Sequence, residues 1–417
     1  MTMTQVRRWI FPRLRGLHKT QLKTISALVW GCLNAAALGV AAIGRGIAGR
    51  TSPRHSIKRV WRFFRNHRIK TEAVMAMLVR QAESFGGMLA VALDWVELRN
   101  RQRALVAGLC RNDGRAFPLS WTVVWNSRFE VSQNEVENAF LAQLAALFSD
   151  PSRVVIVADR GFRRASLLAL LERLKFHYVI RICENVKVDG PRFSGILGRH
   201  ELREGGEDDL GWVDYREDGI IRTRIVARWA RGAEEPWYLA TSGEKTIKRV
   251  CEIYALRMEI EEFLRGLKSH RYGAALRYTL LSEPDRYARL LAIWALGVWL
   301  LVAQGLAAIR RNLHLGLSSA PHSRTDLSYI GAGQPCHSPS KDGGMKKVGM
   351  DQRASRLTAH GGRLDSRFRQ RGREERCDRG QDDGEAPPGA LDRQRDGRDE
   401  RQLGDHVADR AQRRDRP

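Results

Sequence analysis

Four polar residues near position 260 have types and spacings that could build a chemical site. Tyr254, Arg257, Glu261 and Lys268 follow one another at intervals of three, four and seven residues. If residues 246–270 form one helix, their side chains project at about 0°, 300°, 340° and 320°, and so share a sector of roughly 60°. Packed against a sheet, that face would bring a phenol, two cations and a carboxylate together.

A less specific interpretation of the same helix stays open. The four residues could lie on a solvated face, where an Arg257–Glu261 ion pair contributes only a few tenths of a kcal/mol. Glu259 and Glu262 project at about 140° and 80°, outside the shared sector. Only packing against another element would make the face a site, because buried charges are tolerated when they are paired or bound to metal.

Two aspartates stand at apolar segments that have the pattern of strands. Asp94 interrupts the run AVALDW, and Asp159 ends the run SRVVIVAD just before Arg160 and Gly161. Ligands commonly bind beyond the carboxyl ends of strands, so a carboxylate there is a functional candidate. Each has an ordinary alternative, because Asp94 could be a strand-edge residue and Asp159 a turn former before glycine.

Together these residues suggest metal-dependent chemistry. Asp94, Asp159 and Glu261 supply carboxylate oxygens, which Mg²⁺ prefers as ligands, and Mn²⁺ could substitute. Two such ions can activate a water or a 3′-hydroxyl and stabilise the leaving oxygen in phosphodiester cleavage. Arg257 and Lys268 would then hold the adjoining phosphates.

The hydropathy pattern predicts an α/β scaffold for these residues. Three β-like runs over 86–98, 103–112 and 115–125 are joined by short turns, which favours an antiparallel meander. A helix is predicted over 132–148, with Ser132 as N-cap and Glu135 three residues on. The segments that follow it are a buried strand over 152–162, a helix over 163–175, a strand over 177–182, short strands over 185–245 and a helix over 246–270. This order predicts a ribonuclease-H-like core, in which carboxylates stand at strand ends and on a helix beside the sheet.

The charge of the chain indicates its partner. It holds 71 Lys and Arg against 47 Asp and Glu, a net charge of +24, which favours a polyanion such as nucleic acid and argues against a small acidic metabolic enzyme. Residues 1–80 hold 16 of these cations and one acid, Glu72, in a helical pattern. Within them, Trp61, Phe63 and Phe64 are interleaved with cations, as a small helical DNA-binding domain requires. A solvated basic face is the alternative.

The motifs and their order resemble those of a known family. Residues 254–268 (YALRMEIEEFLRGLK) keep every spacing of the signature Y-x2-R-x3-E-x6-K, and ALDW (92–95) and ADRGF (158–162) resemble its two aspartate motifs. The chain thus resembles the bacterial insertion-sequence transposases of the DDE class, in the insertion-sequence-four-like group, and most closely the Tn-ten type of cut-and-paste transposase. The resemblance extends from about residue 57 to residue 309.

The resemblance implies a domain plan. It predicts a ribonuclease-H-like catalytic core with a β-strand insertion, preceded by an all-helical DNA-binding domain. On this basis we expect the DNA-binding domain over 1–80, the core over 86–184 and 246–316, and the insertion over 185–245.

The resemblance also implies roles for single residues. Asp94, Asp159 and Glu261 would be the catalytic metal ligands. Three residues of the signature would contact transposon-end DNA, namely Tyr254, Arg257 and Lys268.

A fourth DNA contact is implied near the end of the insertion. Trp237 stands where the family has a tryptophan that receives a base flipped out beside the cut. An ordinary core tryptophan in a strand is the alternative. Some relatives carry a second Trp directly after the signature Arg, where this chain has Met258.

The implied activity is cut-and-paste transposition. The protein would cut double-stranded DNA at the terminal inverted repeats and join the ends to target DNA, as a homodimer on paired ends if the C-terminus is intact. Two alternatives from the same motifs are a non-catalytic relative that occupies transposon ends and a metal-dependent nuclease that never joins strands.

Residues 317–417 depart from the family. Between 321 and 417 only 12 of 97 residues are large and apolar, and Arg, Asp, Gly, Gln and Ser dominate. We interpret this segment as the product of a shifted reading frame rather than as a genuine disordered tail.

Two uncharged segments, 24–44 and 290–309, approach the length of a membrane span. We interpret both as buried helices of a protein without membrane contact, because the membrane alternative leaves the helix signature unexplained. Scattered cysteines and the absence of a signal-peptide pattern favour a cytoplasmic, nucleoid-associated protein.

Overall fold

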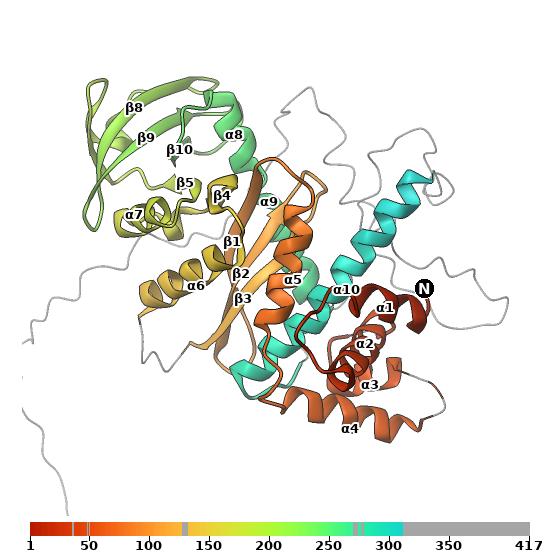
Figure 1. The fold of residues 1–417 in the computed structure, drawn as a ribbon. Helices are drawn as coiled ribbons and strands as arrows, with labels where there is room; N and C mark the ends of the chain where they lie inside the picture. The colour runs from red at the N-terminus through yellow and green to blue at the C-terminus, as the bar shows by residue number, and fades with distance from the viewer. Residues whose placement is uncertain are drawn as a thin grey trace, which may run out of the picture. The chain divides into compact units, whose positions relative to one another are not determined.

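A computed structural model describes residues 1–311, apart from 36, 48, 50, 127–131, 270–273, 277 and 278 (Figure 1). The expectations for residues 317–417 therefore lie outside the described residues. Helices and strands follow in the order α1 (Met3–Ile10), α2 (Lys19–Leu33), α3 (Val40–Gly46), α4 (Pro53–Phe64), α5 (Glu72–Glu83), β1 (Leu89–Glu97), β2 (Gln102–Cys110), β3 (Phe117–Trp125), α6 (Gln133–Leu147), β4 (Val154–Ala158), α7 (Ala165–Arg173), β5 (His177–Ile182), β6 (Lys187–Asp189), β7 (Ser194–Ile196), β8 (Glu207–Arg216), β9 (Ile220–Arg228), β10 (Trp237–Thr241), α8 (Ile247–Ala255), α9 (Met258–Lys268) and α10 (Pro284–Arg310). Short 3₁₀ turns η1, η2 and η3 span Pro151–Arg153, Arg160–Phe162 and Leu197–Arg199.

The strands form one mixed sheet in the order β3-β2-β1-β4-β5-β10-β9-β8-β6-β7. The first three are an antiparallel meander, as predicted, while β4 runs parallel to β1 and β5 runs parallel to β4. This arrangement is consistent with a ribonuclease-H-like core. The predicted helix over 132–148 is also present as α6, where the Ser132 hydroxyl accepts from the backbone N–H of Glu135 in a capping box.

The strands predicted over 185–245 continue this sheet. β10 pairs antiparallel with β5, with Tyr238 opposite Ile182, and β9 and β8 follow outward. These strands extend the edge of the core sheet through direct backbone hydrogen bonds between β5 and β10.

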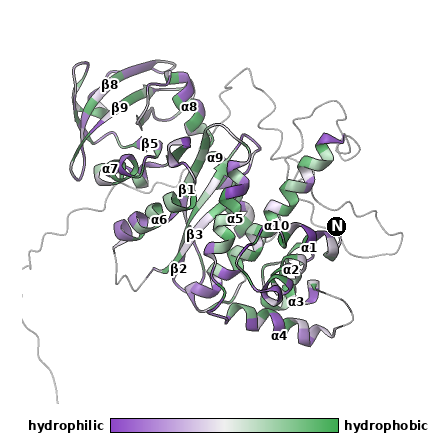
Figure 2. Ribbon diagram, in the orientation of Figure 1, coloured by the Kyte–Doolittle hydropathy of each residue, from purple (hydrophilic) through white to green (hydrophobic). Residues whose placement is uncertain are grey.

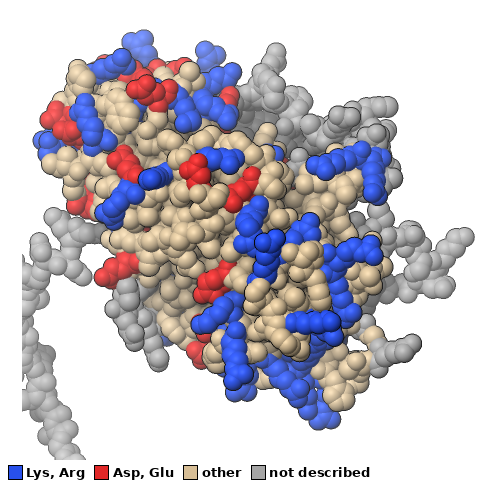
Figure 3. Space-filling model, in the orientation of Figure 1, with Lys and Arg blue, Asp and Glu red and all other residues tan. Residues whose placement is uncertain are grey.

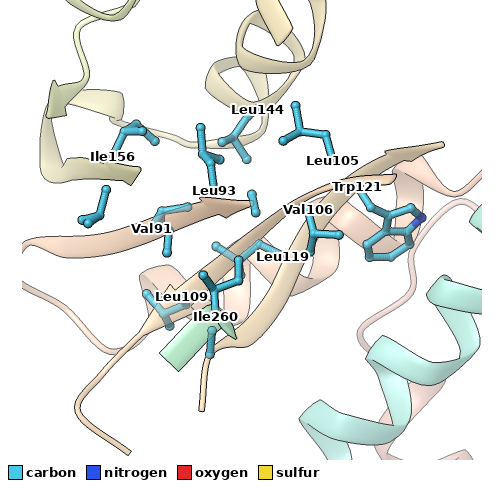
Figure 4. Packing of buried hydrophobic residues seen from close by; sticks show 14 of the residues in the cluster. Val91, Leu93, Leu105, Val106, Leu109, Leu119, Trp121, Leu144, Ile156 and Ile260 are labelled. Carbon is cyan, nitrogen blue, oxygen red and sulfur yellow. The ribbon is translucent and has the colours of Figure 1, made fainter. Parts of the chain in front are cut away.

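Adjacent residues of β3 reach two different helical layers. The Ser120 hydroxyl donates to the sulfur of Met75 on α5, whereas the Trp121 indole N–H donates to the carbonyl of Ala288 on α10. Side chains alternate between the faces of a strand, so α5 and α10 cover opposite faces of the meander. Figure 4 shows the same division in the core, with Leu144 of α6 and Ile260 of α9 on opposite sides of the strands.

The apolar segment 290–309 lies within α10, which is long and apolar enough to span a membrane and is the one such helix in the described ranges. Figure 2 shows this helix largely in the colour of hydrophobic residues, and 67% of its apolar window is buried inside the protein. The Trp299 indole N–H donates to the carbonyl of Pro118, and the buried Arg289 guanidinium donates to the carbonyl of Phe64 on α4. These contacts are those of a core helix.

The other apolar segment, 24–44, does not form one helix. α2 ends at Leu33 and α3 begins at Val40. The segment is therefore divided between two short helices, each below the length of a span.

The prediction of one helix over 246–270 is wrong. α8 ends at Ala255 and α9 begins at Met258. At the junction the N–H groups of Leu256 and Arg257 bond to carbonyls three residues back, at 3.2 and 2.9 Å. Such 3₁₀-type bonds tighten the backbone and change its direction, so a single wheel of 100° per residue does not describe both helices.

Candidate active site

Asp94 and Asp159 stand at matching positions on two neighbouring parallel strands. β1 and β4 pair with Ala92 opposite Val157. Asp94 lies on β1 two residues beyond Ala92, and Asp159 directly follows the end of β4, two residues beyond Val157. The two carboxylates lie near enough for the charge of Asp159 to raise the pKa of Asp94. The prediction that Asp159 stands at the carboxyl end of a strand is confirmed, and Asp94 interrupts β1 as predicted, three residues before that strand ends.

The local backbone explains why Asp159 is followed by Arg-Gly. β4 ends at Ala158, and Asp159 caps the 3₁₀ turn Arg160–Phe162. Its Oδ1 atom accepts from the backbone N–H of Gly161 at 2.9 Å. The turn-forming interpretation of this aspartate is therefore confirmed. It does not exclude a second role, because the bond engages one carboxylate oxygen and Oδ2 is a second potential ligand atom.

Glu261 reaches the aspartates from α9. This helix packs on β1 and β2, and Ile260 is buried over Gly108, where an added Cβ would lie 3.4 Å from its Cδ1 atom. Glu261 follows Ile260 and forms an ion pair with Arg257, the N-cap of α9. The predicted Arg257–Glu261 pair is present across the helix junction, with the guanidinium mostly buried.

The electrostatics show that these side chains act on one another. Burial, together with the charges of Asp159 and Glu261, raises the pKa of Asp94 to about 7, although Arg257 opposes the shift. Burial would lower the pKa of Arg257, but Tyr254 and the three carboxylates outweigh it and raise this pKa. The three predicted metal ligands and the signature arginine therefore lie within electrostatic reach of one another.

Two aromatic residues adjoin this cluster. The ring of Trp237, at the start of β10, lies edge-on to the ring of Tyr254 with centroids 4.8 Å apart. Burial raises the pKa of Tyr254, while Arg257 and Arg181 lower it. The structure thus brings two predicted DNA contacts, Trp237 and Tyr254, to the same place as Arg257.

A neighbouring ion-pair network was missed from the sequence. The Arg181 guanidinium on β5, with its side chain 9% exposed, donates to Glu235 Oε1 at 2.7 Å and to the carbonyl of Pro236. Arg160, next to Asp159, lies 3.7 Å from the other oxygen of Glu235. The network connects the turn of the second aspartate to the segment before Trp237. In the sequence, the three members of this network are single charges in separate segments: Arg160 in ADRGF, Arg181 in HYVIRI and Glu235 in EPWYLATSG.

Two further residues of α9 were assigned positions from the sequence. Lys268 is in the last turn of α9, on the same face as Glu261 but about 10 Å further along the helix axis, so its predicted DNA contact stays a prediction. Glu259, expected outside the cluster, has a structural role. Its buried carboxylate accepts from the backbone N–H groups of Arg111 and Gly114 at 2.8 and 3.0 Å and holds the β2–β3 turn.

The donor chemistry fits a hard divalent cation, because all three candidate ligands are carboxylates, and burial together with the charges of the other two raises the pKa of Asp94. However, no three His, Cys, Asp or Glu side chains in the described ranges are grouped closely enough to hold a metal as they stand. Glu261 is engaged with Arg257. The ion pair engages one carboxylate oxygen of Glu261, so its Oε2 atom is a second potential ligand atom.

The fold is that of an α/β protein whose large mixed sheet is consistent with a ribonuclease-H-like core. Residues 128–293, about two fifths of the chain, match a protein-family model described as a transposase DDE domain. The match supports a DDE-type transposase family. It includes Asp159, Trp237 and the whole signature from Tyr254 to Lys268, whereas Asp94 precedes it. No curated protein matches the chain.

Proposed function

We propose that this protein is a cut-and-paste DNA transposase of the insertion-sequence-four-like group. The observation that carries the proposal is the position of Asp94 on β1 and of Asp159 at the end of the parallel neighbour β4, with Glu261 on a helix packed against the same sheet. These carboxylates would hold Mg²⁺ or Mn²⁺. When bound, the ions would supply Lewis-acid activation of the attacking oxygen and stabilisation of the leaving oxygen.

The protein's own residues would hold the DNA end. Arg257 and Tyr254 would bind phosphates next to the cut, since a mostly buried guanidinium and a neighbouring phenol both donate hydrogen bonds. Trp237 would stack on a flipped base, a contact worth about 1–3 kcal/mol. Water would attack first, the freed 3′-hydroxyl would attack the opposite strand to give a hairpin, and after hairpin opening it would attack target DNA.

The N-terminal helices would bind the transposon end. Lys and Arg side chains gather over α1–α4, whereas acidic and basic side chains mix over β8 and β9 (Figure 3). The apolar side of α4 is buried through Val60, Phe63 and Phe64, which leaves its cations toward solvent. The predicted boundary at residue 80 falls inside α5, which packs on β3, so we restrict the proposed DNA-binding domain to the helices before α5.

A cleavage assay tests the proposal. The full-length protein is incubated with Mg²⁺ or Mn²⁺ and a linear fragment that carries its coding sequence and flanking DNA. Alanine at Asp94, Asp159 or Glu261 should abolish nicking and leave end binding largely intact. Glu262→Ala is the matched control, because Glu262 is on the same helix and pairs with Arg265 instead. A triple variant that still nicks would contradict the assignment.

The same assay separates the alternatives. A metal-dependent nuclease would cut the fragment but give no product joined to target DNA. A non-catalytic end-binding relative would bind the fragment and protect it without cutting. We place the activity in the cytoplasm, on chromosomal DNA, with two copies on paired ends.

A further inference from the structure

A buried carboxylate outside the proposed site draws hydrogen bonds from three parts of the core. The Glu137 side chain on α6 is 1% exposed. Its Oε1 atom accepts from the Trp95 indole N–H at 3.1 Å and from the Gln133 amide at 2.9 Å, and its Oε2 atom accepts from Arg164 at 3.2 Å. A charge this deeply buried is stable only when it is paired and hydrogen-bonded.

The first donor is the direct neighbour of Asp94. Trp95 follows it on β1, and alternation along the strand turns the indole to the α6 face and the carboxylate to the α9 face. The Arg103 guanidinium covers the indole at 4.2 Å from the ring centroid. The indole is therefore held on its face by a cation and at its N–H by Glu137, which restrains the strand that carries Asp94.

Another donor to Glu137, Arg164, belongs to the segment that follows Asp159. Arg164 is the N-cap of α7, five residues after this aspartate, and its side chain is 11% exposed. Besides Glu137 it donates to the Asn138 side chain at 2.8 Å and to the carbonyl of Asn134. The turn after Asp159 is thus fastened to α6 by a charge-assisted pair.

We propose that Glu137 is a positioning residue that sets the separation of Asp94 and Asp159 from the opposite face of the sheet. The Glu137 carboxylate bonds Trp95, which follows Asp94 on β1, and Arg164, which lies five residues after Asp159. Both aspartates are therefore connected to the same helix, α6. The inference rests on the proposed function in one respect, that the two aspartates bind metal. Groups that orient metal ligands typically change metal affinity by about 10–100-fold when they are removed.

The test is Mn²⁺ binding by the full-length protein, followed by the electron paramagnetic resonance signal of free Mn²⁺. Glu137→Gln keeps the volume and one acceptor oxygen but removes the charge that faces Arg164. We expect its Mn²⁺ dissociation constant to rise by about tenfold. Trp95→Phe removes only the indole donor and keeps a ring in place, and it should weaken Mn²⁺ binding in the same direction by a smaller factor.

The control is a partly buried ion pair in the outer strands, whose arginine is as buried as Arg164. Arg224 donates to Asp209 at 2.6 and 3.2 Å, with side chains 11% and 26% exposed. We expect both Asp209→Asn and Glu137→Gln to lower the melting temperature, but Asp209→Asn should leave Mn²⁺ affinity unchanged. A purely structural role for Glu137 would give the same result as this control.

The outcomes separate the inference from the proposed function. Mn²⁺ affinities of Glu137→Gln and Trp95→Phe within twofold of wild type, with Asp94→Asn weakened, would overturn the inference alone. An Asp94→Asn variant that binds Mn²⁺ as tightly as wild type, or a wild type that binds none, would contradict the proposed metal site itself.

Discussion

The indole ring of Trp237 packs edge-on against the phenol ring of Tyr254, with 4.8 Å between the ring centroids and 75° between the ring planes. The two residues are 17 positions apart and come from β10 and α8. Trp237 is only half-buried, and Tyr254 is buried behind it. Tyr254 therefore supports the indole in a fixed orientation beside Arg257, which suits a platform for a base.

Replacement of Trp237 by alanine should weaken binding of a DNA end whose base beside the cut is displaced. The expected loss is about 1–3 kcal/mol, the usual contribution of one base–aromatic stack, and Trp237→Phe should restore most of it. Affinity is measured by fluorescence anisotropy, with an intact end and with an end that lacks this base. If Trp237 stacks on the base, the losses of binding free energy caused by removing the base and by removing the indole will not add up in the double change.

Trp229 provides the control for this cycle. It directly follows β9, in the connection that leads to β10, and its indole N–H donates to the carbonyl of Ala233 at 2.9 Å. Trp229→Phe should leave end binding unchanged. Additive losses for Trp237→Ala and the missing base would show that the indole is a core residue only.

The raised pKa of Asp94 makes this carboxyl a source of instability at neutral and alkaline pH. Its pKa is about 7 in the folded protein against 3.8 ordinarily, so the folded state binds more protons between these values and loses stability as pH rises from 4 to 7. Asp94→Asn should therefore stabilise the metal-free protein at pH 8, by on the order of 2–4 kcal/mol. The gain should shrink as pH falls and vanish near pH 4 in urea titrations with EDTA.

Asp209 should change the stability of the protein with pH in the opposite direction to Asp94. Its hydrogen bonds with Arg224 hold the pKa of this carboxyl below the usual value, so its contribution to stability is present above about pH 4 and is lost at lower pH. Asp209→Asn should destabilise the protein at pH 8. An Asp94→Asn variant that also destabilises at pH 8 would show that Asp94 is not in a crowded, buried environment.

Much of the fold could be predicted from the sequence because its signals are local. The meander 89–125 and the buried strand at 154–158 follow from alternating or continuous apolar residues, and α6 follows from the Ser132–Glu135 capping box. The two aspartates were identified because each interrupts or ends an apolar run. Their matched register needed the structure, since parallel pairing joins segments 65 residues apart.

The remainder depends on tertiary contacts. The break between α8 and α9 has no glycine or proline to mark it, and a periodic apolar pattern continues across Arg257. The place of Glu259 at the β2–β3 turn and of Glu137 behind the sheet depends on backbone and side-chain donors far along the chain. The local sequence pattern does not show which distant residues will become hydrogen-bond partners.

Loss of Arg257 should expose the repulsion between the carboxylates. Arg257→Gln removes the guanidinium that faces Glu261, Asp94 and Asp159, and a buried carboxylate that loses its partner is costly. We expect a loss of about 1–3 kcal/mol at pH 8 in EDTA. Mg²⁺ or Mn²⁺ should then raise the melting temperature of the variant more than that of the wild type, because the cation replaces the missing charge.

Arg249 is the matched control on the preceding helix. It pairs with Glu252 in solvent, with side chains 61% and 44% exposed. Arg249→Gln should change stability by less than about 0.5 kcal/mol with or without divalent cations. Equal cation responses in Arg257→Gln and wild type would refute the link between this arginine and the proposed metal site.

The basic α4 helix gives a prediction that concerns DNA affinity alone. Lys58 and Arg62 are exposed and four residues apart, so they project from the same side of the helix. If both contact phosphates, replacing both by Gln should reduce the slope of log affinity against log salt concentration by about 1.8, because each contact contributes about 0.9. The control Arg173→Gln/Lys187→Gln removes the same charge from exposed positions on α7 and β6 and should leave the slope unchanged. If both double variants have the same slope, any change in salt dependence comes from the net charge alone, and α4 does not contact the DNA.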